Sequence, residues 1–176
     1  MRQKIILGFI VALALLVTSC EKEIVTQGTL DYRFTPVTAS DGYFESRQIA
    51  YPEDIVITGS ASSINEFSLL GSVVEVTGNL VAGDVVRGVV IDVDGIGVYR
   101  IPDVPVYKNG EIITIADSRN NPAFHHFMSD AMYYMSRYGK QDIVVSGYLE
   151  DRYGRHVAGA TVELNIYNDL EVRVNN

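Results

Sequence analysis

Alternation of apolar and polar residues near the C-terminus is the feature that most limits the fold of this chain. A period of two places the apolar side chains on one face of an extended strand and exposes the other face to water. The apolar positions are Val162, Leu164, Ile166, Leu170, Val172 and Val174. Asn168-Asp169 separates the two groups, and we expect a tight turn there. The pattern predicts antiparallel strands with one buried face.

Turn residues divide the rest of the chain into short segments. Segments rich in valine and isoleucine lie between the turns, for example residues 73–76, 85–93 and 143–145. Glycine recurs at intervals of roughly 8–12 residues, at Gly59, Gly71, Gly78, Gly83, Gly95, Gly110 and Gly154. Many short strands at such intervals are typical of β-sandwiches and barrels. We therefore predict a mainly β, antiparallel, sandwich-like single domain.

One segment has helical spacing instead. Asn121 is a suitable N-cap, Pro122 fits the first helical turn, and Gly139 can end the helix. Residues three or four positions apart share one face of a helix, and the apolar ones here are Phe124, Phe127, Met128, Ala131, Met135 and Tyr138. The spacing predicts one amphipathic helix, at about residues 122–138, packed against the sheets.

The N-terminal segment has the composition of an export signal. Arg2 and Lys4 precede an apolar run from Ile5 to Val17, and Thr18-Ser19-Cys20 follows. The run has about 13 residues, fewer than the roughly 20 that cross a bilayer as a helix, so it indicates a cleaved signal peptide. Cys20 is the only cysteine. The chain therefore forms no intramolecular disulfide, and its stability must come from packing.

This order of basic, apolar and small residues before a cysteine resembles the lipobox signal peptide of bacterial lipoproteins. The resemblance implies cleavage between Ser19 and Cys20. It also implies a diacylglycerol thioether on Cys20 and an amide-linked acyl chain such as palmitate. Two or more chains anchor a protein stably, at about 0.8 kcal/mol per buried methylene. Glu21 stands where such lipoproteins carry aspartate for inner-membrane retention, so we expect the outer membrane, on its periplasmic or its cell-surface face.

The resemblance also sets the domain boundaries. Residues 1–19 form the signal peptide, residues 20–28 the lipidated N-terminus and a short tether, and residues 29–176 the β-rich domain. Cleavage removes Arg2 and Lys4 and no acidic residue, so the formal charge changes from −8 to −10. A negative chain is a poor ligand for nucleic acid, whose phosphates require basic patches. The expected partners are the membrane, through the lipid, and an envelope protein.

A second resemblance concerns the region before the C-terminal strands. Gly147-Tyr148-Leu149-Glu150-Asp151, Gly154-Arg155-His156-Val157 and Gly159-Ala160-Thr161-Val162 are similar to the opening hairpin of carboxypeptidase-regulatory-like domains, which are seven-stranded sandwiches. The similarity covers about 16 residues, and too few residues follow it for the remaining strands. We therefore expect the same hairpin within a different sandwich, and the resemblance implies no activity.

One short acidic fragment has the composition of a metal loop. Asp92 and Asp94 stand before Gly95, as carboxylates do in calcium-binding loops. Such a loop needs further oxygen ligands, but Ile96 and Val98 occupy the next positions. We therefore expect a strand that ends in an Asp-Gly turn, and no metal or other cofactor apart from the covalent lipid.

Tyrosine is unusually abundant, with 11 residues and no tryptophan. Tyrosine buries a large area at an interface with little loss of conformational entropy. Tyr133 and Tyr134, on the predicted helix, are therefore the candidate binding residues.

Catalytic motifs are not recognisable, and the Gly-x-Ser-x-Gly motif of serine hydrolases is missing from the sequence. We therefore predict a non-enzymatic, membrane-anchored envelope lipoprotein that acts as a binding, adhesion or assembly module. The first alternative is a carrier of small apolar ligands, with a β-barrel cavity. The second alternative is a hydrolase with a carboxylate-lined cleft.

Overall fold

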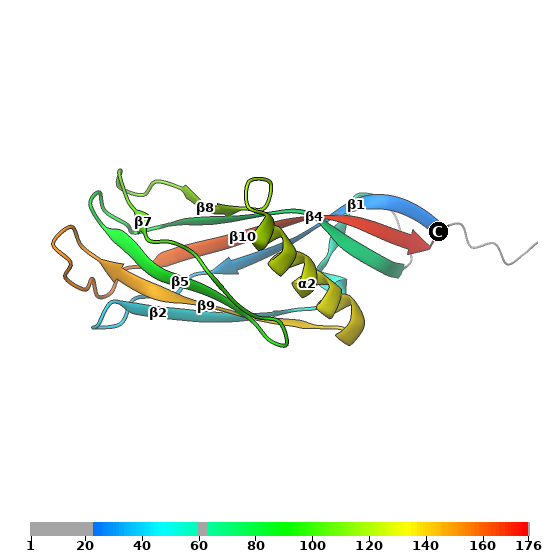
Figure 1. Ribbon diagram of the computed structural model, residues 1–176, viewed down its shortest axis with the longest axis horizontal. Coiled ribbons are helices and arrows are strands. Elements are labelled where there is room, and N and C mark those ends of the chain that lie inside the picture. Colours follow the sequence, from blue (N-terminus) through cyan, green and yellow to red (C-terminus); the bar gives the residue numbers. More distant parts are fainter. Residues whose placement is uncertain (1–22, 60–62, 176) are drawn as a thin grey trace, which may run out of the picture.

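The computed structural model describes residues 23–59 and 63–175. The expected signal peptide, with Ser19 and the lipidation site Cys20, lies outside these residues. The strands form two antiparallel sheets that pack face to face as a β-sandwich, which confirms the predicted fold class (Figure 1). The strands are β1 Glu23–Phe34, β2 Tyr43–Ala50, β3 Val56–Ile57, β4 Ser63–Gly78, β5 Val85–Val93, β6 Gly97–Arg100, β7 Val104–Pro105, β8 Ile113–Asp117, β9 Gln141–Glu150 and β10 Val162–Asn175. The helices are the 3-10 helix η1 Pro52–Asp54 and α2 Pro122–Tyr138.

The first sheet has the strand order β3-β1-β10-β4-β8. Its central strand, β10, pairs with β1 from Leu164 to Asn175 on one side and with β4 along its whole length on the other. The inward side chains of β10 are almost completely buried, and its outward side chains alternate with them. This burial pattern confirms the period of two that the sequence shows.

The turn expected at Asn168-Asp169 is wrong, because β10 continues straight through it. All the apolar positions of the pattern carry even numbers, and Asn168 keeps that phase, so its side chain points inward. There Asn168 is buried and its Nδ2 donates a hydrogen bond to the Leu30 carbonyl oxygen at 2.7 Å. A buried polar side chain is tolerated in a strand when it is hydrogen-bonded, and the unbroken phase was the signal for one strand.

The second sheet has the strand order β2-β9-β5-β6, and β7 also pairs with β5. Between Gly147 and Val162 the chain makes a short antiparallel return and then passes from β9 in the second sheet to β10 in the first. In the return, Glu150 bridges to His156, and the Val157 N–H donates to the Leu149 carbonyl at 3.0 Å. Glycine-rich segments occur both in hairpin turns and in loops that cross between sheets. The composition of residues 147–162 therefore does not distinguish the two.

Helix α2 lies along one side of the sandwich, next to β4 (Figure 1). It has the predicted bounds, because Asn121 Oδ1 accepts the Phe124 N–H at 3.1 Å and Gly139 adopts a left-handed conformation at the C-cap. Its buried residues are Phe124, Met128, Ala131, Met132 and Met135. In the described part of the chain, no helix is long and apolar enough to span a membrane.

Two residues of α2 differ from the expected faces. Tyr138, expected on the buried face, is 68% exposed, while Met132 is buried. The helix enters the space between the two sheets, so its buried face is wider than one stripe and centred closer to Met132. The width of that face depends on the neighbouring strands and is not encoded in helical spacing.

A closed barrel with an apolar cavity, the architecture of the carrier alternative, is contradicted by the structure. The sheets are open, with β2 and β6 at the edges of the second sheet and β3 and β8 at those of the first. Inward side chains of both sheets pack in one cluster with the methionines of α2. A buried hydrogen bond from the Tyr32 hydroxyl to Gln141 Oε1 joins the sheets within this core.

The N-cap of α2 provides a test of the fold. Asn121→Ala removes the acceptor for the Phe124 N–H and the donor to the Tyr99 hydroxyl, which lies 2.7 Å from Asn121 Nδ2. We expect a loss of about 1 kcal/mol in the free energy of unfolding, measured by urea denaturation. The matched control is Asn120→Ala at the exposed neighbouring position, for which we expect a change below about 0.5 kcal/mol. Equal effects of the two substitutions would contradict the capping role.

Candidate functional site

The two ends of the sandwich differ in what they present to solvent. The start of β1 and the end of β10 lie together at one end, because Glu23 pairs with Asn175. Residues 35–42, 79–84, 106–112 and 151–161 form loops at the opposite end, which we call the loop end (Figure 1). Loops on a rigid scaffold are the usual location of binding residues.

Exposed aromatic and apolar side chains gather in the loop end. Tyr107 is 75% exposed, Tyr153 is 69% exposed and Ile112 is 67% exposed, and Val37 and Val81 are also exposed. Large apolar groups in solvent are unfavourable, so several of them on neighbouring loops indicate an interaction surface.

Two arginines contact the ring of Tyr153. The guanidinium carbons of Arg152 and Arg155 lie 5.0 and 5.2 Å from the centre of its ring, which is the geometry of a cation–π contact. Asp151 fixes the turn by accepting the backbone N–H of Tyr153 and that of Arg155. The Arg155 backbone N–H and side chain hold the pKa of the Asp151 carboxyl below its ordinary value. Tyr153 is therefore presented by an ordered turn.

Hydrogen bonds hold the loops of the loop end together. The Gly83 N–H donates to the Val106 carbonyl at 2.8 Å, and the Ala82 N–H donates to Asn109 Oδ1 at 2.8 Å. The Arg152 side chain packs against Gly83, where an added Cβ would lie 3.1 Å from the Arg152 Cβ. These contacts place the Tyr107 and Tyr153 loops against the same connecting loop.

Two cations of the loop end carry unpaired charge. Arg155 forms an ion pair with Asp151 at 2.7 Å. Among residues 23–59 and 63–175, neither Arg152 nor Lys108 has an acidic partner. In a chain with a formal charge of −8, two free cations beside exposed tyrosines favour an anionic partner.

Tyr133 and Tyr134, the predicted binding residues, have different surroundings. Tyr133 is 66% exposed and lines a groove of about 570 Å³ between α2 and β4. Tyr134 is half-buried. Its ring packs at a tilt of 36° against Tyr138, with centroids 4.3 Å apart, and covers Gly95, where any Cβ would collide with the ring. Tyr133 is thus available to a partner, and Tyr134 packs against the turn after β5.

Asp92 and Asp94, the predicted metal candidates, are both exposed. Asp92 points outward from β5 opposite Val98, and Asp94 follows in the turn to β6. A search of the described residues finds no group of three or more His, Cys, Asp or Glu side chains able to hold a metal ion. The two carboxylates therefore stand in a strand that ends in an Asp-Gly turn, as the sequence indicates.

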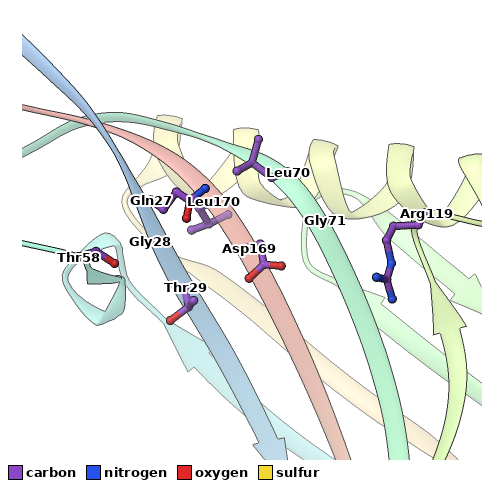
Figure 2. Close-up of a pocket in the computed structure, with 9 residues that line it drawn as sticks. All are labelled: Gln27, Gly28, Thr29, Thr58, Leu70, Gly71, Arg119, Asp169 and Leu170. Carbon is purple, nitrogen blue, oxygen red and sulfur yellow. The ribbon is translucent and has the colours of Figure 1, made fainter.

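A shallow hollow of about 330 Å³ lies on the outer face of the first sheet (Figure 2). The residues that line it are Gln27, Gly28, Thr29, Thr58, Leu70, Gly71, Arg119, Asp169 and Leu170. The Arg119 side chain already forms three hydrogen bonds with the Asp117 carboxylate, at 3.0, 3.2 and 2.8 Å. A Cβ at Gly28 would point away from the hollow, 2.8 Å from a methyl carbon of the buried Val172. The lining of the hollow offers no free charged pair for catalysis.

Carboxylates also line the α2–β4 groove, which bears on the hydrolase alternative. They are Glu23 and Glu66, both exposed, and Glu66 lies 3.6 Å from the Arg173 guanidinium. General acids of hydrolases require a buried, apolar environment to be protonated at neutral pH. The described surface of this groove lacks that environment.

Comparisons with known proteins identify no family. No family model matches the chain, and no curated protein matches it. Among solved structures, a virus-like particle of the giant freshwater prawn Macrobrachium rosenbergii nodavirus aligns with a TM-score of 0.39 and 6% identity, covering 90% of this chain and 98% of that chain. The Macrobrachium rosenbergii nodavirus structure gives 0.46 and 10%, covering 90% and 55%. The mud crab tombus-like virus gives 0.43 and 9%, covering 88% and 83%.

The turn at Asp92 and Asp94 gives a prediction about metal removal. We expect a millimolar chelator to leave the melting temperature of the purified protein unchanged, because the described residues form no ligand cluster. The measurement is thermal unfolding followed by circular dichroism, with added calcium as the reverse control. A fall of several degrees that calcium restores would show that these carboxylates hold a cation.

Proposed function

We propose that this chain is a non-enzymatic envelope lipoprotein that is anchored in the outer membrane through Cys20 and binds a protein partner through its loop end. The proposal combines the lipobox resemblance with one structural observation, the pair of exposed tyrosines on adjoining loops at the end of the sandwich opposite the start of β1. It assigns the chain to adhesion or assembly in the cell envelope.

The geometry suits display of the loop end away from a bilayer. Residues 23–28, expected from the sequence to be part of the tether, belong to β1, so after cleavage only Cys20, Glu21 and Lys22 would precede the strand. Three residues span at most about 11 Å, so the N-terminal end of the sandwich would lie close to the lipid. Strand β1 has 12 residues and, at about 3.3 Å per residue, extends about 40 Å to the loop end.

The chemistry of the loop end suits a protein surface that carries carboxylates. Tyrosine and arginine are enriched at the centres of protein interfaces, where they account for much of the binding energy. Tyr107 and Tyr153 supply aromatic area, and Arg152, which lies over the Tyr153 ring, has no acidic partner among the described residues. The exposed aliphatic residues Val81 and Ile112 favour a protein over a sugar polymer, because they offer no hydrogen bonds.

The lipid anchor is tested by Cys20→Ala. We expect the variant to leave the membrane fraction, because the acyl chains that partition into the bilayer require the cysteine sulfur and the new N-terminus. The measurement is fractionation of cells followed by immunodetection, with Asp92→Ala as an exposed control that should remain in the membrane. A Cys20→Ala protein that still sediments with membranes would contradict the anchor. External protease on intact cells then distinguishes the surface face from the periplasmic face.

The loop end is tested by site-specific photo-crosslinking in cells. We expect a photoreactive residue at Tyr153 or Tyr107 to yield a discrete protein adduct. The same residue at Tyr167, which is exposed on the outer face of the first sheet, should yield none. Arg152→Glu should reduce the adduct about tenfold or more, since charge reversal replaces an attraction with a repulsion. Equal adducts at positions 153 and 167 would contradict a binding surface at the loop end.

A further inference from the structure

Half of strand β4 pairs on one side only. Its partner β10 follows it from Gly78 to Ser63, but β8 pairs with β4 only between Val73 and Val76. Ser118 ends this second ladder: its N–H donates to the Ser72 carbonyl at 2.9 Å, and the Ser72 N–H donates to Ser118 Oγ at 2.8 Å. Within the described residues, Ser63–Gly71 has no strand on that side. Strand edges of this kind are templates for pairing with another chain.

Two irregularities mark the open half of β4. The register with β10 shifts at Leu70 and again at Asn65, so one extra residue of β4 stands at each point. Bulges of this type bend and twist a strand. The two bulges therefore turn the open half of β4, Ser63–Gly71, relative to the part that pairs with β8.

A groove runs along the open edge, with α2 as its second wall. Five consecutive residues of β4, from Asn65 to Leu69, line this groove of about 570 Å³. Successive side chains of a strand point to opposite faces of the sheet. A wall made of consecutive residues is therefore presented edge-on, with its backbone toward the groove. The volume lies in the range of sites that hold a ligand specifically.

The α2 wall offers small and polar side chains together with one aromatic ring. Ser129, Ser136 and Arg137 line it beside the exposed Tyr133. The Ser136 hydroxyl donates to the Tyr133 carbonyl at 2.7 Å, so that side chain lies close to the helix. Small residues leave room for a backbone, and Tyr133 provides a surface for a side chain of the bound segment.

We propose that this groove binds an extended segment of a partner protein, which adds to the first sheet as a strand beside Ser63–Gly71. The alternating donors and acceptors of a strand edge are matched by another extended backbone, and strand addition is an established mode of peptide recognition. The same edge already pairs in this way with β8, one residue beyond Ser72.

The occupant comes from another molecule. Glu23 lines the groove, but after cleavage at Cys20 only three residues would precede it, too few to pair with the nine residues of Ser63–Gly71. The groove lies beside α2 and the N-terminal half of β4, away from the loop end. Strand addition is therefore independent of binding at the loop end, and each can fail without the other.

The experiment selects binders from a display library of random twelve-residue peptides on the full chain purified from membranes in detergent. We expect enriched peptides with apolar residues at alternate positions. Tyr133→Ala should weaken their binding about tenfold, and Ser136→Trp, which fills the groove, should abolish it. The matched control is Asp130→Trp, which adds the same bulk at an exposed position of α2 outside the groove, and it should bind normally.

Amide hydrogen exchange identifies the mode of binding. Added peptide should slow exchange within Ser63–Gly71 and leave Val73–Val76, which β8 already covers, unchanged. Peptides that bind without protecting β4 would overturn strand addition. Enrichment that is equal on the Ser136→Trp protein, or no enrichment at all, would also overturn it. Concentration-dependent dimers that protect the same amides without peptide would show that the occupant is a second copy and would overturn the assignment to a partner protein.

Discussion

The pairing of β10 with β1 and β4 is the interaction on which the rest of the structure depends. β10 contributes twelve residues to the ladder with β1 and fourteen to the ladder with β4, so its register sets which side chains of three strands face the second sheet. Asn168 is the one inward position of β10 that is not aliphatic, and its hydrogen bond to the Leu30 carbonyl allows the strand to continue without a turn. A slip by one residue would move the whole apolar set to solvent.

Strand pairing in the first sheet is incomplete along β4. The first sheet is one strand wider beside the second half of β4 than beside the first half, because β8 is short. Helix α2 fills the space between the sheets with three methionines, Met128, Met132 and Met135. Their flexible side chains fit an irregular gap. The helix completes the hydrophobic core but leaves the backbone edge of β4 facing a groove. Side chains are therefore packed in this region, whereas the backbone of β4 is paired on one side only.

Parts of the candidate surfaces are predictable from the sequence and other parts are not. Tyr133 was predicted from abundance and helical position, and it does line a groove. The turn at Tyr153 was missed, because the glycines and Asp151 around it indicate a loop and give no sign that two arginines contact the ring. Its juxtaposition with Tyr107 depends on hydrogen bonds between loops far apart in the chain, which no local pattern encodes.

The sequence by itself determined the class of the fold, the helix from Pro122 to Tyr138 and the alternation that buries one face of each long strand. These properties follow from side-chain period and capping, which act between residues close in the chain. Tertiary structure decided that β9 and β10 belong to different sheets, that Met132 is buried and Tyr138 exposed, and that β8 leaves half of β4 open. Each of these depends on which distant segments meet, and that is fixed by the packing of the whole core.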